Sequence, residues 1–305
     1  MSWTPDDLPD LTGRTALVTG ANSGIGFHTA RELAAHGANV VLACRNTGSG
    51  REAAAAIEAG SPAATRVEHL DLASLASVRE LAARWEGPLD LLVNNAGVMT
   101  PPHYRETEDG FELQLGTNHF GHFALTGLLL PVLLESPAPR VVSVSSIAHH
   151  DGRPTVLEGN PESSYQPQRA YGNSKLANLL FARELHKRAY AAHSPLVSTA
   201  AHPGVSATEL VADPHGMGSR RIVRLAAPYV MPLLFQSAAA GATATLYAAT
   251  DADPGSYTGP QRLRETRGPI GPAKLSRWAQ DDELALKLWD LSVLRTGVEL
   301  DLEPA

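Results

Sequence analysis

The chain contains 305 residues, of which 43% are hydrophobic and 19% are charged, and its formal net charge is −7. This composition is typical of a globular protein with a sizeable core, and the acidic balance argues against a nucleic-acid partner, which requires a basic face. Cys44 is the only cysteine, so the sequence offers neither a disulfide framework nor a thiolate metal cluster. The polar, acidic N-terminus lacks the apolar run of a secretion signal, and we therefore expect a cytoplasmic protein.

Short apolar and β-branched runs alternate along the chain with longer stretches rich in alanine and leucine. This alternation is typical of βαβ units and predicts a parallel sheet with helices on both faces. The expected strands are Thr15–Thr19, Asn39–Ala43, Arg66–Leu70, Leu89–Val93, Arg140–Ser145, Leu196–Ala201 and Ser256–Thr258. The expected helices are Gly24–His36, one through Ala53–Ile57, Leu75–Trp85, one around Thr117–Leu134 and one that carries Tyr171. Because no linker interrupts the alternation, we predict one domain over residues 1–305, a Rossmann-type, doubly wound α/β fold with seven parallel strands.

Two stretches depart from this rhythm. Residues 149–169 are polar and contain three prolines, which predicts an exposed insertion before the Tyr171 helix. Residues 205–235 combine apolar residues with three arginines. A segment of that length inside a compact domain is usually functional, and we interpret it as a substrate lid. Simple packing against the domain and docking onto a membrane surface are the alternatives, and membrane contact is disfavoured because the chain is acidic overall.

A glycine-rich turn follows the first expected strand. Gly20, Gly24 and Gly26 lie between that strand and a helix, which is the context that a dinucleotide-binding loop requires. Without side chains, the backbone can turn tightly and approach a pyrophosphate at the positive end of the helix. The spacing is Gly-x-x-x-Gly-x-Gly, and the alternative is a glycine turn without a cofactor.

Tyr171 and Lys175 are four residues apart in a segment expected to be helical, so their side chains lie on one face. A free phenol has a pKa of about 10, and a fixed cation beside it favours the phenolate. The pair is therefore a candidate general acid/base, although chance also places tyrosine and lysine at this spacing.

The chain resembles the short-chain dehydrogenase/reductase superfamily, in the single-domain branch with a Tyr-x-x-x-Lys motif. The matching motifs follow the family order over roughly residues 10–265. They are Thr-Gly-x-x-x-Gly-Ile-Gly at 19–26, Asp71, Asn-Asn-Ala-Gly at 94–97, Asn118, Ser145-Ser146, Tyr171 with Lys175, and His-Pro-Gly at 202–204. Three further stretches resemble the retinol-dehydrogenase-like subgroup, near the protochlorophyllide reductases. They are Cys-Arg-Asn at 44–46, Ser-Ile-Ala-His at 146–149 and Ser-Lys-Leu-Ala-Asn at 174–178.

The resemblance implies a catalytic role for Asn118, Ser146, Tyr171 and Lys175. Ser146 would donate a hydrogen bond to a substrate carbonyl oxygen, and adjacent residues of a strand point oppositely, so Ser145 would face away. Tyr171 would exchange the proton. Lys175 would lower the pKa of the phenol and hold the nicotinamide ribose, and Asn118 would link the lysine to water.

The resemblance also implies a nicotinamide dinucleotide cofactor. Arg45 directly follows the second expected strand, where an arginine pairs with the 2′-phosphate of NADP and an acidic residue would accept from the ribose of NAD. NADP(H) is therefore favoured over NAD(H). The expected cofactor contacts are Gly20, Asn22, Ser23, Gly24, Ile25, Gly26, Arg45, Asp71, Leu72, Asn95, Ala96, Gly97, Tyr171, Lys175, Pro203, Gly204 and Thr208.

Taken together, these motifs predict an NADP(H)-dependent oxidoreductase that transfers a hydride between the nicotinamide and a carbonyl or alcohol carbon of an apolar small molecule. Reduction of a carbon–carbon double bond is an open alternative, since Tyr171 would donate the proton there too. A non-catalytic dinucleotide sensor is a weaker one.

The pairs His119/His122 and His149/His150 lack a third ligand at a recognisable interval, so no metal site is expected. A homodimer through the Tyr171 helix and its neighbour is possible by resemblance.

Overall fold

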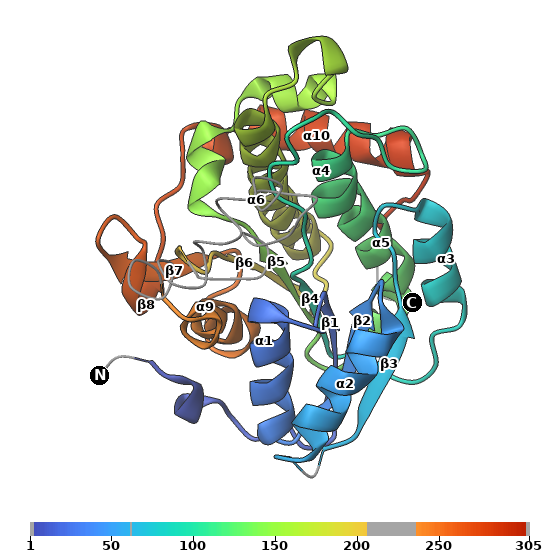
Figure 1. Cartoon of the computed structure of the whole chain (residues 1–305), viewed down its shortest axis with the longest axis vertical. Coiled ribbons are helices and arrows are strands. Elements are labelled where there is room, and N and C mark those ends of the chain that lie inside the picture. Colours follow the sequence, from blue (N-terminus) through green and yellow to red (C-terminus); the bar gives the residue numbers. More distant parts are fainter. Residues whose placement is uncertain (1–2, 62, 206–235, 303–305) are drawn as a thin grey trace.

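A twisted eight-stranded sheet forms the centre of the computed structural model, which describes residues 3–61, 63–205 and 236–302 (Figure 1). The strand order is β3-β2-β1-β4-β5-β6-β7-β8. The strands are β1 (Thr15–Thr19), β2 (Asn39–Cys44), β3 (Thr65–His69), β4 (Leu91–Asn94), β5 (Arg140–Val144), β6 (Val197–Ala201), β7 (Tyr257–Arg262) and β8 (Arg267–Pro272). The order confirms the doubly wound topology, because the chain runs outward from β1 to β3 and then returns to β4 on the other side of β1.

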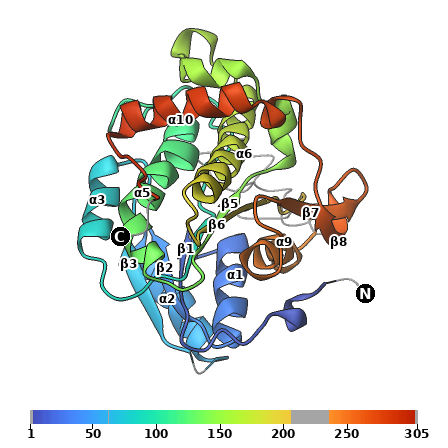
Figure 2. The same ribbon diagram turned by 180° about the vertical axis from the view of Figure 1, so that it is seen from behind.

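Helices cover both faces of the sheet (Figures 1 and 2). The α-helices are α1 (Gly24–Ala35), α2 (Thr47–Glu58), α3 (Leu75–Ala83), α4 (Leu113–Leu115), α5 (Gly121–Leu134), α6 (Pro167–Ala191), α9 (Ala238–Thr250) and α10 (Asp282–Thr296). Helices α1, α2 and α9 lie on one face, and α3, α5 and α6 lie on the other. In the described part of the chain, none of the helices combines the length and the apolar character needed to cross a bilayer.

The central strands are buried on both faces, as their continuous apolar runs predict. Along β1, Ala16 and Val18 belong to the core beneath α1 and α9, whereas Leu17 belongs to the core beneath α5. Leu17 is in register with Val41 of β2 and Leu92 of β4. This two-sided core fixes β1 and β4 side by side at the middle of the sheet.

The prediction of seven parallel strands is incomplete, because an eighth strand pairs antiparallel with β7. Residues Leu263, Arg264 and Glu265 have positive φ angles in the turn that joins β7 to β8. β8 is an edge strand rich in glycine and proline, and only part of its surface is buried. An edge strand of this kind needs no continuous apolar run, so the pattern that identified the other strands was missing.

The segment 149–169 is not an exposed loop throughout. It contains three short 3-10 helices, of which the first begins at Ile147, and α6 already starts at Pro167. His149, Val156 and Asn160 are buried in it. Asn160 donates from Nδ2 to Glu112 Oε2 at 3.0 Å and accepts from Asn173 Nδ2 at 2.7 Å. The polar composition of this segment therefore reflects buried hydrogen bonds as well as solvent exposure.

Helix α10 packs across α6 and α5, as seen from behind in Figure 2. The Trp289 ring stacks on Phe181 of α6 and meets Phe123 of α5 edge-on, with centroid distances of 5.9 and 5.2 Å. Helix α6 carries Tyr171 and is therefore one of the two helices through which the family resemblance implies a homodimer. α10 thus covers part of the surface that α6 would offer to a second copy.

Asp90 joins the start of β1 to the start of β4. Its carboxylate accepts hydrogen bonds from Thr15 N, Ser136 Oγ and Arg14 Nη1 at 2.6–2.9 Å. Burial alone would raise the pKa of this carboxyl group, but these three hydrogen bonds and the Arg14 charge hold it below its usual range. The folded state therefore favours the carboxylate.

We expect Asp90→Asn to lower the free energy of unfolding by about 1–3 kcal/mol at pH 7, because hydrogen bonds to a charged acceptor are weakened or lost. A depressed folded-state pKa contributes stability above the pKa of the unfolded chain, and this stability disappears as the pH falls through the folded-state value. Urea unfolding at pH 7 and pH 3 should show that the gap between wild type and variant narrows in acid. The exposed Asp253→Asn variant is the control, and an equal gap at both pH values would contradict the assignment.

Candidate active site

The predicted site residues converge at the carboxyl ends of β1, β4 and β5. In an open α/β sheet this edge carries the ligand, at the point where the strand order reverses. Here the reversal lies between β1 and β4. The glycine-rich turn follows β1, Asn95–Gly97 follows β4, and Ser145–Ser146 follows β5.

The glycine-rich turn is fastened to the segment after β4. Thr19 Oγ1 accepts hydrogen bonds from the backbone amides of Asn95 and Ala96, both at 2.9 Å. Asn95 Nδ2 donates to Thr19 O at 2.8 Å. A Cβ atom at Gly26 would collide with Gly20 O and with Asn95 Nδ2. Glycine is therefore required at position 26 for the backbone to close against these two residues.

The residues around this turn fit a dinucleotide. Ser23 is the residue before α1, but its side chain accepts no hydrogen bond from the backbone amides of the helix. The amides at Gly24, Ile25 and Gly26 in the first turn therefore lack a serine cap. Such amides bind phosphate at a helix N-terminus. Asn22 Nδ2 donates to Ser49 Oγ at 3.3 Å, which ties the turn to α2.

The expected adenosine contacts lie at the ends of β2 and β3. Arg45 is exposed immediately after β2. Asp71 Oδ1 accepts from Ala73 N at 2.9 Å, and Leu72 is buried in the core beneath α3 and α5. This arrangement leaves the guanidinium of Arg45 accessible to a charged ligand beside a structured turn.

The two serines after β5 have different partners. Ser145 Oγ donates to Lys175 O in α6 at 2.7 Å. Ser146 Oγ accepts from Ala148 N at 3.2 Å, and it is the side chain that opposes the rise in the pKa of the Tyr171 phenol. The geometry thus pairs Ser146, and not Ser145, with the tyrosine.

Tyr171 and Lys175 are adjacent on α6, but their pKa shifts differ from the sequence-based expectation. Burial raises the pKa of Tyr171 to about 12, and Ser146 acts in the opposite direction. Burial lowers the pKa of Lys175 to about 8. The ammonium lies over the phenol ring at 5.7 Å from its centroid and donates to Val144 O at 3.1 Å. In this geometry the ammonium donates to a carbonyl, and desolvation determines the direction in which the pKa of the phenol shifts.

Asn118 connects the segment after β4 to α6. It lies fully buried in a π-helical turn, Gly116–Phe120, between α4 and α5. Its Oδ1 accepts from Val98 N at 2.8 Å, while Nδ2 donates to Val98 O and to Ser174 Oγ at 3.0 and 2.9 Å. All polar atoms of its side chain are thus used to hold α6 against the chain after β4.

Two buried histidines that were not among the expected site residues contact the main chain of those residues. His122 Nδ1 lies 3.0 Å from Asn118 O, and its Nε2 lies 2.9 Å from Thr19 Oγ1. His149 Nδ1 lies 2.7 Å from Ser146 O. The sequence signal that could have identified them is their spacing, since His122 lies four residues after Asn118 and His149 lies three residues after Ser146.

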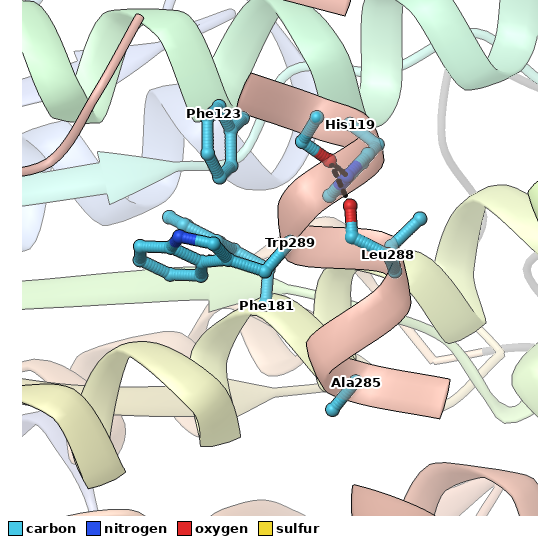
Figure 3. Close-up of a pocket in the computed structure, with 7 residues that line it drawn as sticks. His119, Phe123, Phe181, Ala285, Leu288 and Trp289 are labelled. Carbon is cyan, nitrogen blue, oxygen red and sulfur yellow. Dashed lines mark hydrogen bonds between the residues drawn. The ribbon is translucent and has the colours of Figure 1, made fainter. Parts of the chain in front are cut away.

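His119 belongs to another environment. It faces a small aromatic pocket between α5, α6 and α10, where its Nε2 lies 2.8 Å from Ser292 Oγ (Figure 3). Burial lowers its pKa to about 3. The described residues contain no group of His, Cys, Asp or Glu side chains that could hold a metal ion.

The expected contacts after β6 are only partly described. Gly204 N donates to His202 Nδ1 at 3.2 Å, and Gln236 Nε2 donates to Pro203 O. Thr208 and most of the expected lid at 205–235 lie outside the described residues. The described part of the candidate site thus brings together the glycine-rich turn, the segment after β4, Asn118, Ser146, Tyr171 and Lys175.

Comparison with protein-family models adds an independent finding. The model described as short chain dehydrogenase matches residues 14–215. The chain belongs to the short-chain dehydrogenase family. It is an oxidoreductase of the class that acts on CH–OH or C=O groups.

Curated relatives confirm the retinol-dehydrogenase-like subgroup. Retinol dehydrogenase 13 from Homo sapiens is 40% identical over 295 residues, which cover 95% of this chain and 86% of the relative. Polyprenol dehydrogenase from Mus musculus is 41% identical over 303 residues, with coverages of 96% and 87%.

Solved structures confirm the fold. An uncharacterized protein from Mycobacterium paratuberculosis is 43% identical with a TM-score of 0.82, over 99% of this chain and 100% of that chain. A short chain dehydrogenase from Escherichia coli, complexed with NADPH, is 26% identical with a TM-score of 0.60, over 79% and 93% of the two chains.

We expect Gly26→Ala to abolish measurable NADPH binding and to lower the free energy of unfolding by about 1–3 kcal/mol, because the added methyl group forces Gly20 and Asn95 apart. NADPH fluorescence titration and urea unfolding measure the two effects. Gly60→Ala is the matched control, since its Cβ would come no closer than 3.8 Å to Ile57 O. Wild-type affinity in Gly26→Ala would show that the turn does not carry the cofactor.

Proposed function

We propose that the protein is an NADP(H)-dependent oxidoreductase that transfers a hydride between the nicotinamide and the carbonyl or alcohol carbon of an apolar small molecule, with Tyr171 as general acid/base. The observation that carries this proposal is the convergence of three groups at the end of β5, where the buried ammonium of Lys175 lies 5.7 Å from the centroid of the Tyr171 ring and Ser146 acts on the same phenol. A hydrogen-bond donor, a proton donor and a fixed cation are the groups that carbonyl reduction requires.

When bound, the nicotinamide cofactor supplies the hydride for reduction or accepts it in oxidation. Ser146 Oγ already accepts from the Ala148 amide, so its own hydrogen is free to bind the carbonyl oxygen of a substrate. As charge develops on that oxygen, Tyr171 transfers its phenolic proton to it and an alcohol forms. Burial keeps the Tyr171 phenol protonated, which is the form that reduction needs.

Lys175 contributes a positive charge that water screens only weakly, because the residue is 4% exposed. With a pKa of about 8, its amine is mostly protonated at neutral pH. The charge favours the tyrosinate that remains after proton transfer. Lys175 would also bind the nicotinamide ribose, and the glycine-rich turn would bind the pyrophosphate.

The preference for NADP(H) and for an apolar substrate rests on separate support. Arg45 is exposed where the adenosine ribose lies in this fold, and a guanidinium pairs with a 2′-phosphate in two parallel hydrogen bonds. The E. coli neighbour is complexed with NADPH. The relatives named after retinol and polyprenol support an apolar alcohol, or the corresponding aldehyde, as the substrate class.

We expect Tyr171→Phe to lower kcat for the NADPH-dependent reduction of all-trans-retinal by about 10²-fold or more, because the phenylalanine ring keeps the shape but loses the proton. NADPH affinity should stay within about twofold of wild type, since the ring does not carry the phosphates. Stopped-flow absorbance follows turnover, and fluorescence titration follows binding. Turnover that survives this substitution would refute the proton-transfer role.

We expect Arg45→Asp to raise the KM for NADPH by about 10- to 100-fold and to improve the relative use of NADH, because a carboxylate repels the 2′-phosphate and accepts from the ribose hydroxyl. Steady-state kinetics with both cofactors measures the ratio of their kcat/KM values. Arg267→Asp makes the same charge change on the exposed edge strand β8 and serves as the control. An unchanged NADPH/NADH ratio in Arg45→Asp would overturn the cofactor assignment.

A further inference from the structure

His149 makes four hydrogen bonds, three of which define how the turn after β5 is closed. Its backbone amide donates to Ser146 O at 3.0 Å, and its ring Nδ1 lies 2.7 Å from the same oxygen. Its ring Nε2 accepts from Ser276 N at 3.1 Å. The imidazole is fully buried. It therefore bridges the backbone of Ser146 and a segment that lies more than a hundred residues further along the chain.

The Ser276 contact fixes the tautomer of this ring. A backbone amide can only donate, so Nε2 carries no proton and accepts. The remaining proton of the neutral ring lies on Nδ1, which therefore donates to Ser146 O. Burial, the first cause, and the nearby His150 lower the pKa of His149 to about 4, although the Ser146 contact acts in the opposite direction. The neutral form is consequently the one present at neutral pH.

The turn that His149 closes also determines the position of the Ser146 hydroxyl. Ser146 caps the 3-10 helix Ile147–Asp151, with its Oγ accepting from Ala148 N. On the other side, Ala148 O lies close to α6, because a Cβ atom at Gly172 would be 2.9 Å from it. Gly172 directly follows Tyr171. The turn is therefore held between α6, next to Tyr171, and the C-terminal segment at Ser276.

We propose that His149 is a positioning residue, which holds the Ser146 hydroxyl beside the Tyr171 phenol by fixing the turn 146–149 to Ser276. This inference rests on the proposed function, because it assigns His149 a role through Ser146 in the same reaction. The two nitrogens have separable tasks. Nδ1 sets the geometry of Ser146, whereas Nε2 attaches the segment between β8 and α10.

Two substitutions separate these tasks. In His149→Asn, the side-chain amide reaches as far as Nδ1 and can still donate to Ser146 O, but the acceptor for Ser276 N is lost. In His149→Gln, the amide reaches as far as Nε2 and can accept from Ser276 N, but the donor to Ser146 O is lost. We expect kcat with NADPH and all-trans-retinal to stay within about threefold in His149→Asn and to fall by about 10- to 100-fold in His149→Gln, as small misplacements of a catalytic group do.

Thermal stability should follow the opposite order, with the Tm of His149→Gln above that of His149→Asn. The KM for NADPH should stay within about twofold in both variants, because the glycine-rich turn is untouched. His193→Asn is the control, since this histidine is exposed just after α6, and its kcat should remain within about twofold of wild type. A kcat that tracks Tm across the variants would indicate a merely structural histidine and would overturn the proposal.

A readout independent of turnover uses the wild-type protein labelled with 15N-histidine. A long-range proton–nitrogen correlation spectrum, with the His149 signal identified by its loss in His149→Asn, should show a neutral ring protonated at Nδ1. A ring protonated at Nε2 would contradict the inference. If wild-type protein failed to reduce all-trans-retinal with NADPH while the ring was protonated at Nδ1, the proposed function would fail and the contact with Ser146 would stand.

Discussion

The carbonyl of Val144, at the end of β5, is the point on which the site depends. Lys175 Nζ and Asn178 Nδ2, one helical turn apart on α6, both donate to it at 3.1 Å. In return, Ser145 Oγ donates to the backbone of Lys175. A buried ammonium without a partner is costly, so α6 has one favourable packing position against the end of β5. This packing position places Tyr171 beside Ser146.

Hydrogen bonds also connect the other parts of the site, namely the segment after β4 and the glycine-rich turn, to α6. Asn118 reaches α6 through Ser174 and reaches the chain after β4 through Val98. Thr19 then joins the glycine-rich turn to the amides of Asn95 and Ala96. Groups separated by more than 150 residues in sequence are thereby connected through buried hydrogen bonds. Such fully satisfied networks make the arrangement rigid, which is the condition for catalysis by preorganised groups.

The sequence allowed prediction of the parts that depend on local patterns. The glycines at 20, 24 and 26 predict a turn. The separate apolar runs between Thr15 and Ala201 predict buried parallel strands. Other features depend on tertiary contacts that no local pattern encodes. The raised pKa of Tyr171 follows from desolvation by the elements packed around it, and the role of His149 follows from a contact with Ser276. β8 was missed because an edge strand of glycine and proline needs no apolar run. Residues 149–169 appeared exposed because the partners of their buried polar groups, such as Glu112 and Asn173, lie elsewhere in the chain.

Transfer of a labelled hydride is the most direct test of the proposed chemistry. Purified protein would be incubated with NADPH carrying deuterium at both C4 positions and with all-trans-retinal, and the product would be analysed by mass spectrometry. The account predicts retinol with one deuterium on the former carbonyl carbon. Retinol without the label at that carbon, or deuterium added instead across a carbon–carbon double bond, would contradict it.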